Sequence, residues 1–133
     1  MILVTGANGL LGSYLVKLLL QKGEKVRGLK RKNSDLSLLG DYASKVEWVE
    51  GDVLDIVSLH EAMEGIDHVI HSAAIISFFR HDKKEMYKIN VEGTTNVVNT
   101  AIEKNVKRFV HISSVAAVGR TPGGSQVHED KKW

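Results

Sequence analysis

Three glycines near the start of the chain stand at a spacing that suits phosphate binding. Gly6, Gly9 and Gly12 follow a short apolar run at residues 2–4 and precede a helical pattern of leucines. Gly6 can turn sharply out of a strand, Gly9 lets the backbone approach a pyrophosphate, and Gly12 lets a helix pack close to the strand. An anion would then lie on the free N–H groups of the first helical turn, where the helix dipole favours negative charge.

The form of this glycine loop favours a dinucleotide over ATP or GTP. Its spacing is G-x-x-G-x-x-G, and it lacks the lysine of a Walker loop. Glycines also end strands and cap helices for structural reasons alone, so the position between a strand and a helix carries the argument. The residues predicted to bind the cofactor here are Gly6, Asn8, Gly9, Leu10, Leu11 and Gly12.

The residues after the second apolar run bear on the choice between NADP and NAD. An acid at this place accepts hydrogen bonds from the adenosine ribose, whereas a cation accommodates a 2′-phosphate. The chain has Leu29, Lys30, Arg31 and Lys32 here, and no acid before Asp35. Arg31 can hold a phosphate through two hydrogen bonds, which favours NADP, with NAD as the other possibility. The alternative reading is a solvated basic turn.

Two further strand ends carry residues that suit a bound dinucleotide. Asp52 can accept a hydrogen bond from an adenine amino group while the backbone of Val53 reads the ring edge, although a turn or N-cap aspartate explains the same residue. Ala73 and Ala74 are small enough for a cofactor ribose to lie across them, and small residues also permit tight helix packing.

A serine pair at 113–114 follows the fifth apolar run. A hydroxyl at that edge can bind a substrate carbonyl or carbinol oxygen beside a nicotinamide ring. A serine after a strand is also a common turn former.

The elements that must position these residues alternate along the chain. Runs of strand length recur at 2–4, 25–29, 46–49, 68–71 and 108–112, and helical segments are expected before residue 23, at 58–63 and at 83–104. The pattern predicts an α/β fold, a doubly wound parallel sheet of order 3-2-1-4-5. The ligand is expected at the carboxyl ends of the strands.

Composition narrows the function classes. With 133 residues the chain suits one domain, and without cysteine it has no disulfide framework or thiolate metal site, which fits a cytoplasmic protein. No apolar run reaches membrane length and no signal peptide is evident. The net charge of +2 is small, so no nucleic-acid partner is expected. The histidines lack a zinc spacing, so no metal is predicted.

Several motifs together resemble the extended short-chain dehydrogenase/reductase family, also called the NAD-dependent epimerase/dehydratase family. They occur at residues 5–12, 51–53, 71–74, 90–94 and 113–119, in family order. Residues 26–31 with 34–35, and 113–119, are most similar to the dihydroflavonol-reductase-like and 3β-hydroxysteroid-dehydrogenase-like branch. The resemblance implies a Rossmann-type NAD(P)-binding domain over residues 1–133.

The resemblance also implies catalytic roles. Ser114 would be the serine that holds the reacting oxygen, and Asn90 the helix asparagine that supports the active site. The family further uses a tyrosine followed four residues later by a lysine, and no tyrosine of this chain has that lysine. We therefore expect the N-terminal part of a longer enzyme, without the last strands and the C-terminal substrate domain, and with little activity of its own.

The expected function is NADP(H)-dependent hydride transfer to or from a ketone or secondary alcohol, as in a dihydroflavonol reductase. Sugar-nucleotide epimerase or dehydratase chemistry is the nearest alternative, and a non-catalytic NAD(P)-sensing module is an alternative of another class. The family further implies a homodimer through the helix at 83–104 in the full-length protein.

Overall fold

The computed structural model describes residues 1–119, 123 and 126–128. Its centre is one parallel sheet of five strands in the order β3-β2-β1-β4-β5, which confirms the predicted fold class and strand order. The strands are β1 (Ile2–Thr5), β2 (Val26–Lys30), β3 (Glu47–Glu50), β4 (His68–His71) and β5 (Arg108–His111).

The central strand shows why the sheet is covered on both faces. Every residue of β1 is buried, as expected of a parallel strand between two helical layers. Because side chains alternate along a strand, Leu3 packs into one core, while Ile2 and Val4 pack into the other.

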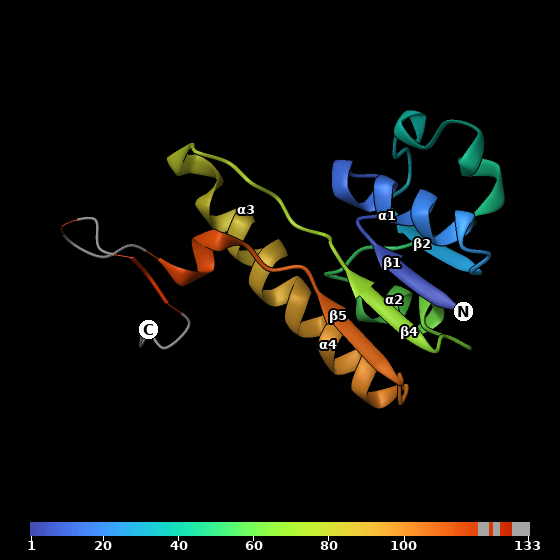
Figure 1. Ribbon diagram of the computed structural model, residues 1–133. Coiled ribbons are helices and arrows are strands. Elements are labelled where there is room, and N and C mark those ends of the chain that lie inside the picture. The colour runs from blue at the N-terminus through green and yellow to red at the C-terminus, as the bar shows by residue number, and fades with distance from the viewer. Residues whose placement is uncertain (120–122, 124–125, 129–133) are drawn as a thin grey trace.

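Helices form a layer on each face of the sheet. In Figure 1, α1 lies on one face and α2 and α4 lie on the other, with β5 at the edge of the sheet. The helical elements are α1 (Leu10–Gln21), η1 (Ser37–Lys45), α2 (Ile56–Ala62), η2 (Arg80–Asp82), α3 (Lys83–Tyr87), η3 (Lys88–Gly93), α4 (Thr94–Glu103) and η4 (Val115–Val118). Among these, no helix is both long and apolar enough to cross a membrane.

The helix predicted over 83–104 is continuous but not regular. It consists of α3, a π-helical turn η3 and α4, and it runs alongside β5 and past the end of that strand (Figure 1). A π turn inserts one extra residue and is frequent at functional sites. Here Asn90 bonds to a distant backbone segment and Gly93 packs against Val53, so the turn coincides with two contacts that draw the helix towards the sheet.

Helix α2 begins two residues before the predicted start at 58. The Asp55 side chain accepts a hydrogen bond from the Val57 N–H at 3.0 Å and so caps the helix at Ile56.

The amino ends of the strands are joined by ion pairs. Asp67 accepts from the amino group of Met1 at 2.7 Å and from Lys107 Nζ at 2.6 Å. The lysine and the amino group hold the pKa of the Asp67 carboxyl well below its ordinary value. This cluster of charged groups thus lies at the amino ends of the strands, opposite to the predicted site.

Candidate functional site

A cleft of about 240 Å³ lies at the carboxyl ends of the strands. This is the edge where a doubly wound sheet binds its ligand, at the point where the strand order reverses beside β1. The cleft is lined by Gly6, Asn8, Gly9, Leu29, Lys30, Arg31, Gly51, Asp52, Val53, Ser72, Ala73, Ala74, Ile75 and Ile89.

The three glycines of the loop differ in how closely other atoms pack against them. Gly6 has φ +66°, and a Cβ there would come within 2.8 Å of the Ala73 backbone. A Cβ on Gly12 would lie 2.0 Å from the Gly6 carbonyl oxygen, so the start of α1 packs directly on the loop. A Cβ on Gly9 would meet only that same oxygen, at 3.3 Å. Packing therefore requires Gly6 and Gly12, whereas Gly9 lines the cleft and has few neighbours.

A cation lines the cleft after β2, and the nearest following acid is hydrogen-bonded to a serine and not to this cation. Arg31 is exposed and lines the cleft. Asp35 is turned to Ser37, accepting from its N–H at 2.8 Å and from its hydroxyl at 2.7 Å. These bonds, the hydroxyl foremost, hold the pKa of the Asp35 carboxyl below its ordinary value. The Asn8 amide donates to the Asp35 carbonyl at 3.4 Å and links this turn to the glycine loop.

The turn after β3 is held by its own hydrogen bonds. The Asp52 carboxylate accepts from the Leu54 N–H at 2.9 Å, and the Asp52 N–H donates to Ser58 Oγ at 3.1 Å. Asp52 is therefore a turn aspartate, whereas Asp55 caps α2. Since Asp52 and Val53 also line the cleft, the structural and the ligand-binding readings of this segment are compatible.

A buried histidine joins the ends of β1 and β4 to helix α4. His71 is 1% exposed, with Nδ1 2.7 Å from Thr5 Oγ1 and Nε2 2.9 Å from Thr94 Oγ1. Burial, together with the neighbouring His111, lowers the pKa of His71 to about 4. A neutral imidazole donates at one nitrogen and accepts at the other, so both of these contacts are satisfied. Thr5 Oγ1 also accepts from the Ala73 N–H at 3.3 Å.

Asn90 holds the backbone of one residue that lines the cleft. Its amide accepts from the Ile75 N–H at 2.9 Å and donates to the Ile75 carbonyl at 2.8 Å. Ile75 lines the cleft, so Asn90 fixes the backbone of a lining residue without lining the cleft itself.

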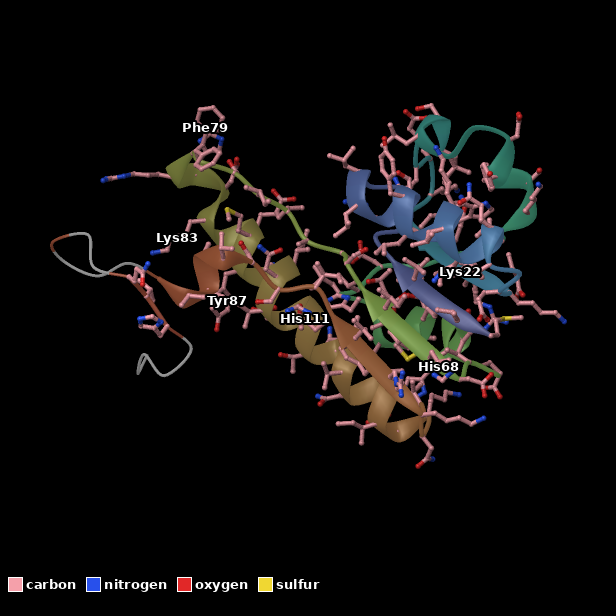
Figure 2. The ribbon with its side chains drawn as sticks, viewed as in Figure 1. Lys22, His68, Phe79, Lys83, Tyr87 and His111 are labelled. Carbon is pink, nitrogen blue, oxygen red and sulfur yellow. The ribbon has the colours of Figure 1, made fainter. Side chains whose placement is uncertain are left out.

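Ser114 lies apart from the cleft lining. It is exposed, and its hydroxyl accepts from the Ala116 N–H at 3.2 Å as the N-cap of η4. The segment after β4 is also open to solvent. Phe78 is 97% exposed, and Figure 2 shows Phe79 at the far end of this segment, away from the strands.

The structure brings together most of the predicted cofactor residues, and the cleft has lining residues that sequence reasoning did not assign. Those that line it as predicted are Gly6, Asn8, Gly9, Arg31, Asp52, Val53, Ala73 and Ala74. Leu10, Leu11 and Gly12 form the first turn of α1 beside it. Ile75 and Ile89 were missed, and the signal available for Ile75 was its place directly after the two alanines.

The comparisons with known proteins agree with this geometry. The model of the NAD dependent epimerase/dehydratase family matches residues 2–132. The chain belongs to this family.

Curated relatives extend the match to named proteins. Sterol demethylase protein B of Methylococcus capsulatus is 43% identical, over 92% of this chain and 37% of that protein. Cinnamoyl-CoA reductase 1 of Petunia hybrida is 42% identical, over 90% and 36%. A 3-beta-hydroxysteroid dehydrogenase of Mycolicibacterium neoaurum is 34% identical, over 88% and 32%, in line with the expected branch. The chain spans about a third of the length of these relatives.

Solved structures share the fold and include the cofactor. The Bordetella bronchiseptica enzyme WbmH in complex with NAD+ is similar with a TM-score of 0.82 and 30% identity, over 97% of this chain and 44% of that chain. A short-chain dehydrogenase/reductase superfamily protein from Agrobacterium tumefaciens with bound NAD gives 0.75 and 35%, over 89% and 33%.

Proposed function

We propose that the chain is the cofactor-binding part of an NADP(H)-dependent oxidoreductase that acts on a ketone or secondary alcohol. The observation that carries this proposal is that Arg31 lines the same cleft as Gly9, while the nearest following acid, Asp35, is bonded to Ser37. An open phosphate cradle beside a guanidinium for which no ion pair is found among the described residues suits a dinucleotide with a 2′-phosphate. The relatives named as a reductase and a dehydrogenase support the reaction class.

Each side of the cleft then has a role in binding. The first-turn N–H groups of α1 would hold the pyrophosphate, and Arg31 would hold the 2′-phosphate. Asp52 and Val53 would receive the adenine ring, and Ala73 with Ala74 would lie under the nicotinamide ribose. A bound nicotinamide would supply the hydride to a ketone or accept it from a secondary alcohol.

The reaction itself needs residues beyond these. We assign Ser114 to hold the reacting oxygen and Asn90 to fix the Ile75 backbone beside it. Because the relatives are about three times as long as this chain, we place the proton-transfer pair and the substrate-binding residues outside residues 1–133. Residues 1–133 are then the NAD(P)-binding domain of the longer protein, which we also propose to be cytoplasmic and homodimeric through the α3–α4 helix.

The test is a calorimetric titration of the chain with NADPH and with NADH. We expect NADPH to bind at least about tenfold more tightly, because hydrogen bonds to a charged group contribute about 1.5–3 kcal/mol. Arg31→Gln should remove the preference, whereas Arg108→Gln, at the opposite end of the sheet, should leave it unchanged. Tighter binding of NADH, or a preference that Arg31→Gln does not alter, would contradict the proposal.

A second candidate is supported by the family description and by the NAD complex of WbmH. A sugar-nucleotide epimerase or dehydratase keeps the same cradle but has no need of a 2′-phosphate site. Preferential NAD binding in the titration above would favour this reading over the reductase.

A further inference from the structure

The end of the cleft next to β3 is held by a residue that no motif assigned. Asn96, on α4, donates from its side-chain amide to the Val53 carbonyl at 3.1 Å. The two residues are 43 positions apart, and Val53 is buried where it lines the cleft. A helix on the outer layer thus reaches the turn that would receive the adenine ring.

The Val53 carbonyl depends on this contact. Neighbouring backbone groups are bonded within the turn or to α2: the Asp52 N–H to Ser58, the Leu54 N–H to the Asp52 carboxylate, and the Asp55 N–H to the Asp52 carbonyl at 2.9 Å. Among the described residues, Asn96 is the one hydrogen-bond donor to the Val53 carbonyl. A buried carbonyl without a partner carries a desolvation cost, so the turn would shift if the amide were lost.

The helix also holds the Val53 side chain. Gly93 is buried, and a Cβ there would lie 2.6 Å from Val53 Cγ2. Gly93 and Asn96 are three residues apart, so they lie on one face of the helix. Val53 is therefore fixed at its side chain by close packing and at its carbonyl by a hydrogen bond.

The same stretch of helix holds the other walls of the cleft. Asn90 bonds to the Ile75 backbone, and Thr94 contacts His71, which in turn contacts Thr5 at the end of β1. The walls that these residues hold belong to different strand ends, so loosening one contact need not disturb the others.

We infer that Asn96 is a positioning residue for the adenosine end of the cleft, acting through the Val53 carbonyl. This inference rests on the proposed dinucleotide function. Asn96 on α4 then positions the turn after β3, whereas Gly9 and the first turn of α1 form the phosphate cradle.

The test compares Asn96→Leu and Asn96→Ser with Asn99→Leu and Asn99→Ser. Asn99 is exposed on the same helix. The control substitutions therefore also remove a side-chain amide from α4, but they leave the hydrogen bond from Asn96 to Val53 intact. The first measurement is amide hydrogen exchange of the unliganded chain. We expect faster exchange at Leu54 and Asp55 in the Asn96 variants, and wild-type exchange in the Asn99 variants.

The second measurement is titration with ADP and with inorganic pyrophosphate. Loss of one neutral hydrogen bond predicts an affinity for ADP lower by about three- to tenfold in the Asn96 variants, with pyrophosphate binding unchanged. A wild-type chain that binds neither ligand would overturn the proposed function, and with it the assignment of this turn to adenosine. If wild type binds ADP but the Asn96 variants match the Asn99 controls in exchange and affinity, the inference is wrong and the proposed function stands.

Discussion

The two ends of the cleft differ in how completely the chain builds them. At the β2–β3 end, hydrogen bonds fix the turns that carry Arg31 and Asp52, and Asn96 adds a contact from the far layer. At the β4–β5 end the chain leaves the sheet in open segments, where Phe78 is 97% and Val115 is 90% exposed. The difference fits our proposal that residues 1–133 recognise the adenosine half of the cofactor and that the proton-transfer pair lies outside them.

The largest expected effect concerns activity. No tyrosine in the chain has a lysine four residues later, and general acid–base assistance is worth a factor of about 10²–10⁴. We predict that the purified chain oxidises NADPH with aldehydes or ketones at least about 100-fold more slowly than Petunia hybrida cinnamoyl-CoA reductase 1 does with cinnamoyl-CoA. A rate within tenfold of that enzyme would show that the β5 end is complete.

The glycines give the next largest effect. Gly12→Ala would force a Cβ against the Gly6 carbonyl and should lower the free energy of unfolding by about 3 kcal/mol or more. Gly9→Ala should change it by less than about 1 kcal/mol, since Gly9 has φ −75° and few neighbours, while NADPH affinity falls about tenfold. Urea unfolding and calorimetric titration of the two variants measure these values. Equal destabilisation by both would remove the argument that Gly9 serves the ligand.

A pH effect is expected from the histidine between the two ends. His71 has its pKa lowered from 6.5 to about 4, so between these values the unfolded chain binds a proton that the folded chain does not. The stability that the neutral His71 contributes is therefore fully present above pH 6.5, and the free energy of unfolding falls as the pH drops towards 4. From pH 7 to pH 5 this amounts to about 2 kcal/mol.

Urea unfolding at the two pH values tests this effect against His71→Gln. The variant should lose most of the pH dependence, because its amide does not titrate. An unchanged dependence in the variant would assign the effect to other groups.

The smallest effects come from a matched pair of serines. Ser58 is buried and bonds to the Asp52 N–H, so Ser58→Ala should weaken ADP binding by about threefold. Ser114 caps only the short η4, so Ser114→Ala should leave ADP and NADPH affinity within a factor of two. Titrations of both variants give the comparison. If the two serines mattered equally for ADP, the ends of the cleft would not differ as described.

Sequence patterns predicted the sheet because the apolar runs and the turn residues between them indicate the same alternation of strands and helices. The apolar runs match the strands to within one residue at each end, and the turn residues Gly6, Arg31 and Asp52 all follow a strand, so topology alone brings them to one edge. Parallel strands place their carboxyl ends together, which is why residues far apart in sequence could be predicted to share a cleft.

Features that depend on long-range contacts were not predictable in this way. The π turn coincides with contacts of Asn90 to Ile75 and of Gly93 to Val53, and these are partners 15 and 40 positions away. The buried His71 contacts Thr94, which lies 23 positions later in the chain on α4. Whether Ser114 reaches a substrate stays a prediction, because it is not among the residues that line the cleft.

The most direct test of the account is a calorimetric titration of the wild-type chain with the two halves of the cofactor. We predict that the affinity for 2′,5′-ADP is within about tenfold of the affinity for NADPH. Nicotinamide mononucleotide should show no binding at millimolar concentration. Comparable binding of both halves would contradict the claim that these residues build the β2–β3 end of the cleft more completely than the β4–β5 end.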